Sequence, residues 1–149
     1  MSNDNNFSFS QLCFKDEWCY ENPDNGFCYK SGVIPKKLFY SEIKGDISID
    51  EATNAMPAFS AVYESGVLTN SSFIRITDYS GVLKASIAAR KTYASAVNRL
   101  NEKYNCRPSA TFICGASLFI RASLRLIAAF VNQKLTFVDS VEEAFSRIS

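Results

Sequence analysis

The sequence predicts an α/β domain whose mixed, mostly parallel sheet carries helices mainly on one face. Two patterns predict this fold: two aromatic and β-branched strands lie close together early in the chain, and strands then alternate with amphipathic helices. Strands that alternate with helices lie parallel, through right-handed crossovers. The expected order is β-β-α-β-α-β-α-β-α. With 149 residues, 47% of them apolar, the chain is long enough to bury the core of one domain.

Residues 1–25 are predicted to form an N-terminal extension, ahead of the α/β domain over residues 26–149. The segment is polar and ends in the turn-forming run Glu21-Asn-Pro-Asp-Asn-Gly26. Its apolar side chains indicate that part of it packs on the domain or on a second copy of the chain. These side chains are Phe7, Phe9, Leu12, Phe14 and Trp18.

The first two strands are predicted over residues 27–34 and 38–44, joined as a hairpin by a turn at Pro35-Lys36-Lys37. A helix follows, because Ser48 and Glu51 have the spacing of a capping box. Pro57 falls in the middle of this helix and removes an N–H donor, so we expect a kink or two short helices.

The rest of the chain alternates regularly between strands and helices. Residues 72–78 are the predicted central strand, and the run Asp78-Tyr79-Ser80-Gly81 after it is interpreted as a switch loop. The longest amphipathic helix is predicted over residues 85–104, and residues 109–114 have the apolar centre of a buried parallel strand. The remaining elements are a helix over about residues 115–132, a strand over residues 135–138 and a helix that begins at the capping box Ser140-Val-Glu-Glu143.

The predicted functional site is the edge where the parallel strands end and the helices begin. Ligands dock at such edges because unpaired backbone N–H groups converge there and attract anions. We expect a small anionic ligand or a protein partner, with Tyr79 as an exposed aromatic and Lys84 adding positive charge. Ser117 and Ser140 have the alternative role of merely capping their helices. The predicted site residues are Asp78, Tyr79, Ser80, Gly81, Lys84, Ser86, Gly115 and Ser117.

Charge is nearly balanced over the whole chain, with a formal net charge of +1. Between Lys84 and Arg125, however, basic residues far outnumber acidic ones. Because no aromatic-rich recognition motif accompanies this basic stripe, we interpret it as the solvated faces of two helices. No nucleic-acid partner is therefore expected.

Catalytic and metal chemistry find little support in the composition. General acid–base catalysis near neutral pH most often uses His, and the chain has none. The 5 cysteines have no zinc spacing, so we expect free, mostly buried thiols and no metal or cofactor. An odd cysteine count also fits a reducing, cytoplasmic compartment. We expect no signal peptide and no membrane span.

Three features resemble a known family: the element order, the strand ending in Asp78-Tyr-Ser-Gly-Val82, and the closing run Phe137-Val-Asp-Ser-Val-Glu-Glu-Ala144. Together they look like the sulphate transporter and anti-sigma factor antagonist (STAS) domain, in particular its SEC14-related bacterial branch, from about Phe27 onward. The resemblance implies a non-enzymatic module that switches a protein partner, senses a small ligand or serves as the input segment of a signalling protein. It also allows a homodimer, since such domains often pair through apolar surface.

One departure from the family concerns phosphorylation. Antagonists that a kinase switches carry an Asp-Ser-Ser/Thr-Gly loop, whereas the matching positions here read Ala85-Ser86-Ile87-Ala88. Phosphorylation at Ser86 or Ser80 is therefore not expected, and a sensory or scaffolding role comes first. The alternative is a carrier of a lipid or small apolar ligand, favoured by a large cavity between the Pro57 helix and the sheet. An enzyme that uses the Cys106 thiol comes third.

Overall fold

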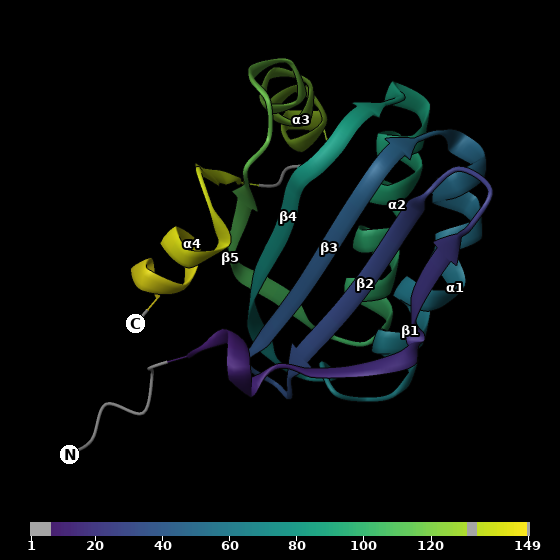
Figure 1. The fold of residues 1–149 in the computed structure, drawn as a ribbon. Helices are drawn as coiled ribbons and strands as arrows, with labels where there is room; N and C mark the ends of the chain where they lie inside the picture. The colour runs from purple at the N-terminus through teal and green to yellow at the C-terminus, as the bar shows by residue number, and fades with distance from the viewer. Residues whose placement is uncertain (1–6, 131–133, 149) are drawn as a thin grey trace.

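The computed structural model describes residues 7–130 and 134–148 and shows a six-stranded sheet with helices on both faces (Figure 1). The strands are β1 (Cys13–Asn22), β2 (Phe27–Ile34), β3 (Leu38–Ile47), β4 (Ser72–Ala85), β5 (Arg107–Cys114) and β6 (Thr136–Val138). The helices are the 3-10 helix η1 (Phe9–Gln11), α1 (Ile49–Glu64), α2 (Ile87–Lys103), α3 (Leu118–Phe130) and α4 (Val141–Arg147). In this part of the chain no helix is long and apolar enough to cross a membrane.

The sheet is mixed, and its strands lie side by side in the order in which they occur along the chain. β1, β2 and β3 pair antiparallel, while β3, β4, β5 and β6 pair parallel. The tight turn of the β2–β3 hairpin is closed by the Lys37 N–H, which donates to the Ile34 carbonyl at 2.9 Å. The predicted α/β class, the hairpin and the mostly parallel sheet are thereby confirmed.

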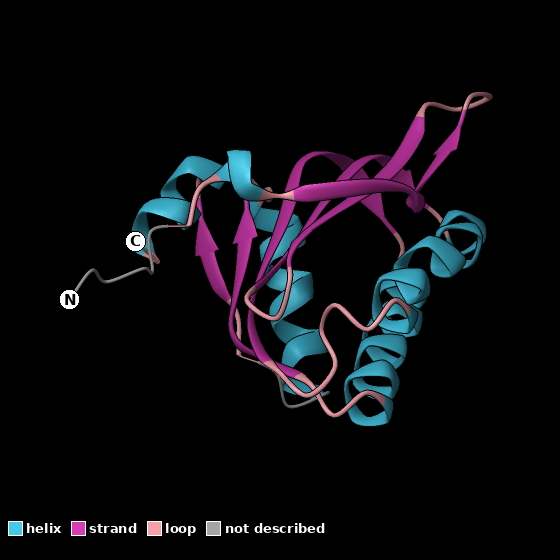
Figure 2. Cartoon of the chain, turned by 90° about the horizontal axis from the view of Figure 1, so that it is seen from below, coloured by secondary structure: helices cyan, strands magenta, loops and turns pink. Residues whose placement is uncertain are grey.

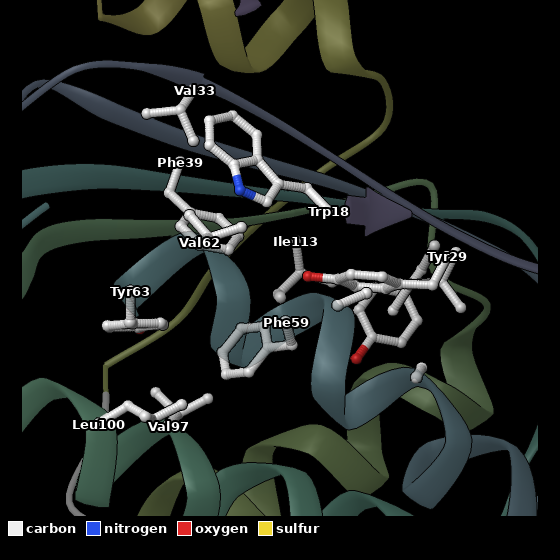
Figure 3. Packing of buried hydrophobic residues seen from close by; sticks show 14 of the residues in the cluster. Trp18, Tyr29, Val33, Phe39, Phe59, Val62, Tyr63, Val97, Leu100 and Ile113 are labelled. Atoms are coloured by element: carbon white, nitrogen blue, oxygen red, sulfur yellow. The ribbon is translucent and has the colours of Figure 1, made fainter. Parts of the chain in front are cut away.

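Helices α1, α2 and α3 cover one face of the sheet, and α4 covers the other together with η1. Figure 2 shows the curved sheet between these two helical layers. The larger core lies on the α1–α3 face, where Trp18, Phe39 and Phe59 are fully buried (Figure 3). The smaller core lies under α4 and contains Tyr40, Phe112 and Phe145. The prediction of helices mainly on one face is confirmed.

Strand β1 was not predicted: the segment expected to be an extension contributes an edge strand to the sheet. Of its ten residues only Trp18 is fully buried, and the pairing with β2 is shifted between Phe14 and Cys19. The shift interrupts the alternation of polar and apolar residues that normally identifies a strand. Trp18 itself is 1% exposed and anchors β1 on the larger core.

Helix α1 begins as predicted, because the Ser48 Oγ accepts the Glu51 N–H at 3.2 Å. It then continues through Pro57 as one helix, so the expected division into two short helices is wrong. Pro57 and Thr53 both lie on the exposed side, where water can solvate the carbonyl that lacks a partner. Burial of Phe59 and Tyr63 on the opposite side offsets the cost of the proline.

Strand β4 is longer than predicted and leaves no loop at Asp78–Gly81. It continues to Ala85, and its second half pairs with β3 through Gly81 and Lys44. The interpretation of residues 78–81 as a switch loop is therefore wrong. Helix α2 starts only after Ser86, which is its N-cap.

Candidate functional site

The predicted site residues lie on the second half of β4, at the start of α2 and on the turn before α3. The structure brings some of them together and separates others. Gly115, which has a φ of +68°, lies directly against Ser80: a Cβ on Gly115 would come 2.7 Å from the Ser80 Cβ. The Ser80 N–H in turn donates to the Asp78 carboxylate at 2.9 Å. Asp78, Ser80 and Gly115 thus form a compact junction where β4 meets the end of β5.

Two of the predicted serines cap helices. The Ser86 Oγ accepts the Ala89 N–H at 2.9 Å at the start of α2. The Ser117 Oγ accepts the Ile120 N–H at 3.3 Å at the start of α3. The hydrogen bond to Ile120 shows that Ser117 has the capping role that was considered for it.

Lys84 and Ser86 line a surface groove of about 420 Å³ at this edge of the molecule. Apolar side chains face solvent here: Leu83 is 81% exposed and Phe119, which also lines the groove, is 78% exposed. Ile87, which follows Ser86, and Leu118, which precedes Phe119, are exposed as well. We call Leu83, Lys84, Ile87, Leu118 and Phe119 the edge patch. Exposed apolar side chains gathered around one groove are typical of a surface that binds a partner.

Asp78 and Tyr79 point away from the edge patch, to opposite faces of the sheet. Asp78 lines a second groove, of about 540 Å³, with Phe9, Tyr40 and Phe145 under α4. Tyr79 lies inside the larger core and is only 5% exposed, so its prediction as an exposed aromatic is wrong. The alternation of side chains along an uninterrupted strand sends the two residues to different faces.

Sequence reasoning missed two buried arginines, Arg75 on β4 and Arg90 on α2, each 4% exposed. Arg75 stands within the apolar run Phe73-Ile-Arg-Ile76, and a charge inside such a run is the signal that identifies it. Arg90 carried no comparable signal, since it belonged to a stretch rich in basic residues. Among the described residues, neither guanidinium has an ion-pair partner, and Nη1 of each is buried without a hydrogen bond.

Aromatic rings hold the Arg75 guanidinium in place. Its Cζ lies 5.2 Å from the ring centre of Phe39, 5.4 Å from that of Phe59 and 5.3 Å from that of Tyr93. One Nη also donates to the Tyr93 hydroxyl. These contacts stabilise the cation but carry no negative charge to neutralise it.

Arg90 is bonded only to backbone oxygens. Its Nε donates to the Ser86 carbonyl at 3.3 Å, and one Nη donates to the Ala85 carbonyl. Burial lowers the pKa of the Arg90 guanidinium from its ordinary value of 12.5. Both bonds fasten the side chain across the N-terminus of α2, and Nη1 is buried without a hydrogen bond to the described residues.

Two small cavities share part of their lining at Arg90. The first, of about 40 Å³, lies between α1, α2 and the sheet, and the second, of about 50 Å³, lies between α2, α3 and the sheet. Tyr79, Arg90 and Tyr93 line both cavities, and Arg75 lines the second. The sequence therefore places a positively charged, apolar-walled space inside the larger core.

The buried thiols lack the features of a catalytic site. Burial raises the pKa of Cys114 to about 12, and burial also raises the pKa of Cys106. An activated thiol needs the opposite shift. Within residues 7–130 and 134–148, no group of three or more Cys, Asp or Glu side chains is arranged to hold a metal ion.

Comparison with known proteins gives a relationship at the level of the fold. No family model matches the chain, and no curated protein sequence matches it. Seven chains of solved structures match. One is an uncharacterized protein of the DUF3478 family with a SpoIIAA-like fold, from Shewanella loihica PV-4, with a TM-score of 0.55 and 12% sequence identity. The match covers 87% of this chain and 99% of that one. The chain thus has a SpoIIAA-like fold, which is the fold of STAS domains.

Proposed function

We propose that this chain is a non-enzymatic, cytoplasmic regulatory domain of the STAS type that binds a protein partner through the edge patch. The observation that carries the proposal is the exposure of Leu83 and Phe119 around the groove beside Lys84 and Ser86. The SpoIIAA-like fold supports it, because domains with this fold are often regulatory.

Charge around the edge patch specifies the partner. Lys84 and Asp46 both line the groove, so it carries one charge of each sign. A partner that offers apolar side chains and a carboxylate opposite Lys84 matches such a surface, and opposite charges speed the encounter.

The volume of the cavity beside α1 does not support the alternative function, a carrier of a lipid or small apolar ligand. A cavity does lie between α1 and the sheet, where a carrier would need one, but its volume is about 40 Å³. Pockets for drug-sized ligands have volumes of roughly 300–1,000 Å³. A lipid chain does not fit this space.

The test uses a double variant of the edge patch, Leu83→Ser with Phe119→Ser, and the charge reversal Lys84→Glu. Leu126→Ser is the matched control, because Leu126 is 75% exposed on the same helix as Phe119 but does not line the groove. Proteins captured by the wild-type chain and by each variant are compared, and the affinity of a purified partner is then measured at two salt concentrations.

We expect the partner to bind the wild type and Leu126→Ser alike. The double variant and Lys84→Glu should bind it at least about tenfold more weakly, which corresponds to about 1.4 kcal/mol. Equal binding by all variants contradicts the proposal. A homodimer in the native mass spectrum that disappears in the double variant also contradicts it, since a second copy then occupies the patch.

A further inference from the structure

Two positive charges buried without a counter-charge are costly, and they need an explanation. The free-energy cost of an uncompensated buried ion is several kcal/mol, so proteins rarely retain one without a partner. Arg75 and Arg90 are both more than nine-tenths buried, and no carboxylate of the described residues pairs with either. The tyrosines nearby do not supply the charge, because burial raises the pKa of Tyr29 and of Tyr79 above the ordinary 10.0.

We propose that the space beside Arg75 and Arg90 binds a small carboxylate with a short apolar chain. Nη1 of each arginine is the unused donor, and both side chains line the second cavity. A guanidinium pairs with a carboxylate more strongly than with a neutral acceptor. The bound anion provides the missing counter-charge.

The walls of the cavities specify the rest of the ligand. Away from the two arginines, the second cavity is lined mainly by apolar side chains, including Val97, Ile113, Leu124 and Ile127. An alkyl chain fits this lining, whereas an inorganic oxyanion leaves it unused. A volume of about 50 Å³ limits the ligand to a few non-hydrogen atoms, so butyrate is a suitable probe.

This site is separate from the edge patch and goes beyond the proposed partner binding. It lies between the sheet, α2 and α3, whereas the patch faces solvent at the end of β4. Arg90 nevertheless connects the two, because it bonds the carbonyls of Ala85 and Ser86 behind the patch. A carboxylate at Arg90 therefore acts on the backbone that carries the groove.

The experiment measures binding of sodium butyrate by titration calorimetry and by the rise in Tm, at constant ionic strength. Acetate, phosphate and chloride are tested in parallel. Arg90→Met and Arg75→Met remove the two donors, and Arg90→Lys keeps the charge without Nη1. Arg99→Met is the matched control, since Arg99 is an exposed arginine on the same helix as Arg90.

We expect saturable butyrate binding by the wild type and Arg99→Met, and affinity lowered at least about tenfold in the other three variants. Without butyrate, Arg90→Met should have an equal or higher Tm than the wild type, because it removes an unpaired buried charge. A purely structural arginine would give the opposite change in Tm. Absence of saturable butyrate binding overturns the proposal, and so does tighter binding of phosphate or chloride. Neither result requires a protein partner, so failure here leaves the proposed function standing.

Discussion

Ser80 occupies the space that a side chain on Gly115 would need. A Cβ on Gly115 would come 2.7 Å from the Ser80 Cβ, 3.1 Å from its Cα and 3.3 Å from its N. The contact fixes the turn after β5 against the middle of β4, just where the two parallel strands separate. Position 115 therefore accepts only glycine without rearrangement.

Substitution Gly115→Ala should lower the free energy of unfolding by about 2–4 kcal/mol, measured by urea unfolding. The φ of +68° disfavours a Cβ, and crowding against the Ser80 backbone adds to that cost. Gly26→Ala is the control, because Gly26 has a φ of +75° but no atom within 4 Å of the added Cβ. Equal losses in the two variants would show that the Ser80 contact contributes nothing.

Substitution Ser86→Ala should lower the free energy of unfolding by about 1 kcal/mol, because it removes the N-cap of α2. Ser80→Ala should leave stability unchanged within about 0.5 kcal/mol, since Ser80 is exposed and its hydrogen bond to Asp78 comes from the backbone N–H, which alanine keeps. Thermal unfolding of both variants checks the comparison. A larger loss for Ser80→Ala would contradict the assignment of the capping role to Ser86.

Stability should fall as the pH rises through the ordinary range of thiol ionisation. Burial raises the pKa of Cys114 from 9.0 to about 12, so the folded protein keeps this proton after the unfolded chain has released it. The unfolded state then binds fewer protons, and stability decreases with increasing pH. Between about pH 8 and pH 10 this thiol should remove about 1.4 kcal/mol of unfolding free energy.

Urea unfolding across this pH range measures the effect, with two variants as comparison. Cys114→Ala should lose the contribution of this thiol to the pH dependence. Cys13→Ala should keep it, because Cys13 is exposed. Identical pH profiles for the wild type and Cys114→Ala would show that the thiol ionises equally in both states.

Substitution Trp18→Ala should lower the free energy of unfolding by about 3–5 kcal/mol, because it leaves a large cavity in the core. Trp18→Phe should cost much less, since the buried indole N–H that it removes has no hydrogen-bond partner in the described part of the chain. Unfolding followed by circular dichroism measures both. A small effect of Trp18→Ala would mean that β1 is not part of the cooperatively folded unit.

Local signals in the sequence predicted most elements correctly. The hairpin before Ser48 and the caps at Ser48 and Ser140 depend on residues close together in the chain, and the structure contains all of them. The parallel pairing of the later strands followed from their alternation with helices. These features need no information about distant contacts.

Features that depend on distant contacts were the ones missed. Strand β1 exists because it pairs with β2 and buries Trp18, while its own pattern is interrupted by the shifted register. Strand β4 continues past Asp78 because β3 pairs with its second half, although Gly81 suggests a turn. Arg75 and Arg90 line one cavity because α2 packs on the sheet. Their spacing along the chain does not predict this contact between distant elements.

The order of the strands in the sheet also has a consequence for biosynthesis. Since β1 to β6 lie in the order in which they are made, each strand finds its pairing partner already present when it emerges from the ribosome. No strand must be inserted between two earlier ones. The sheet can therefore grow in one direction during translation, with each new strand added beside the one made just before it.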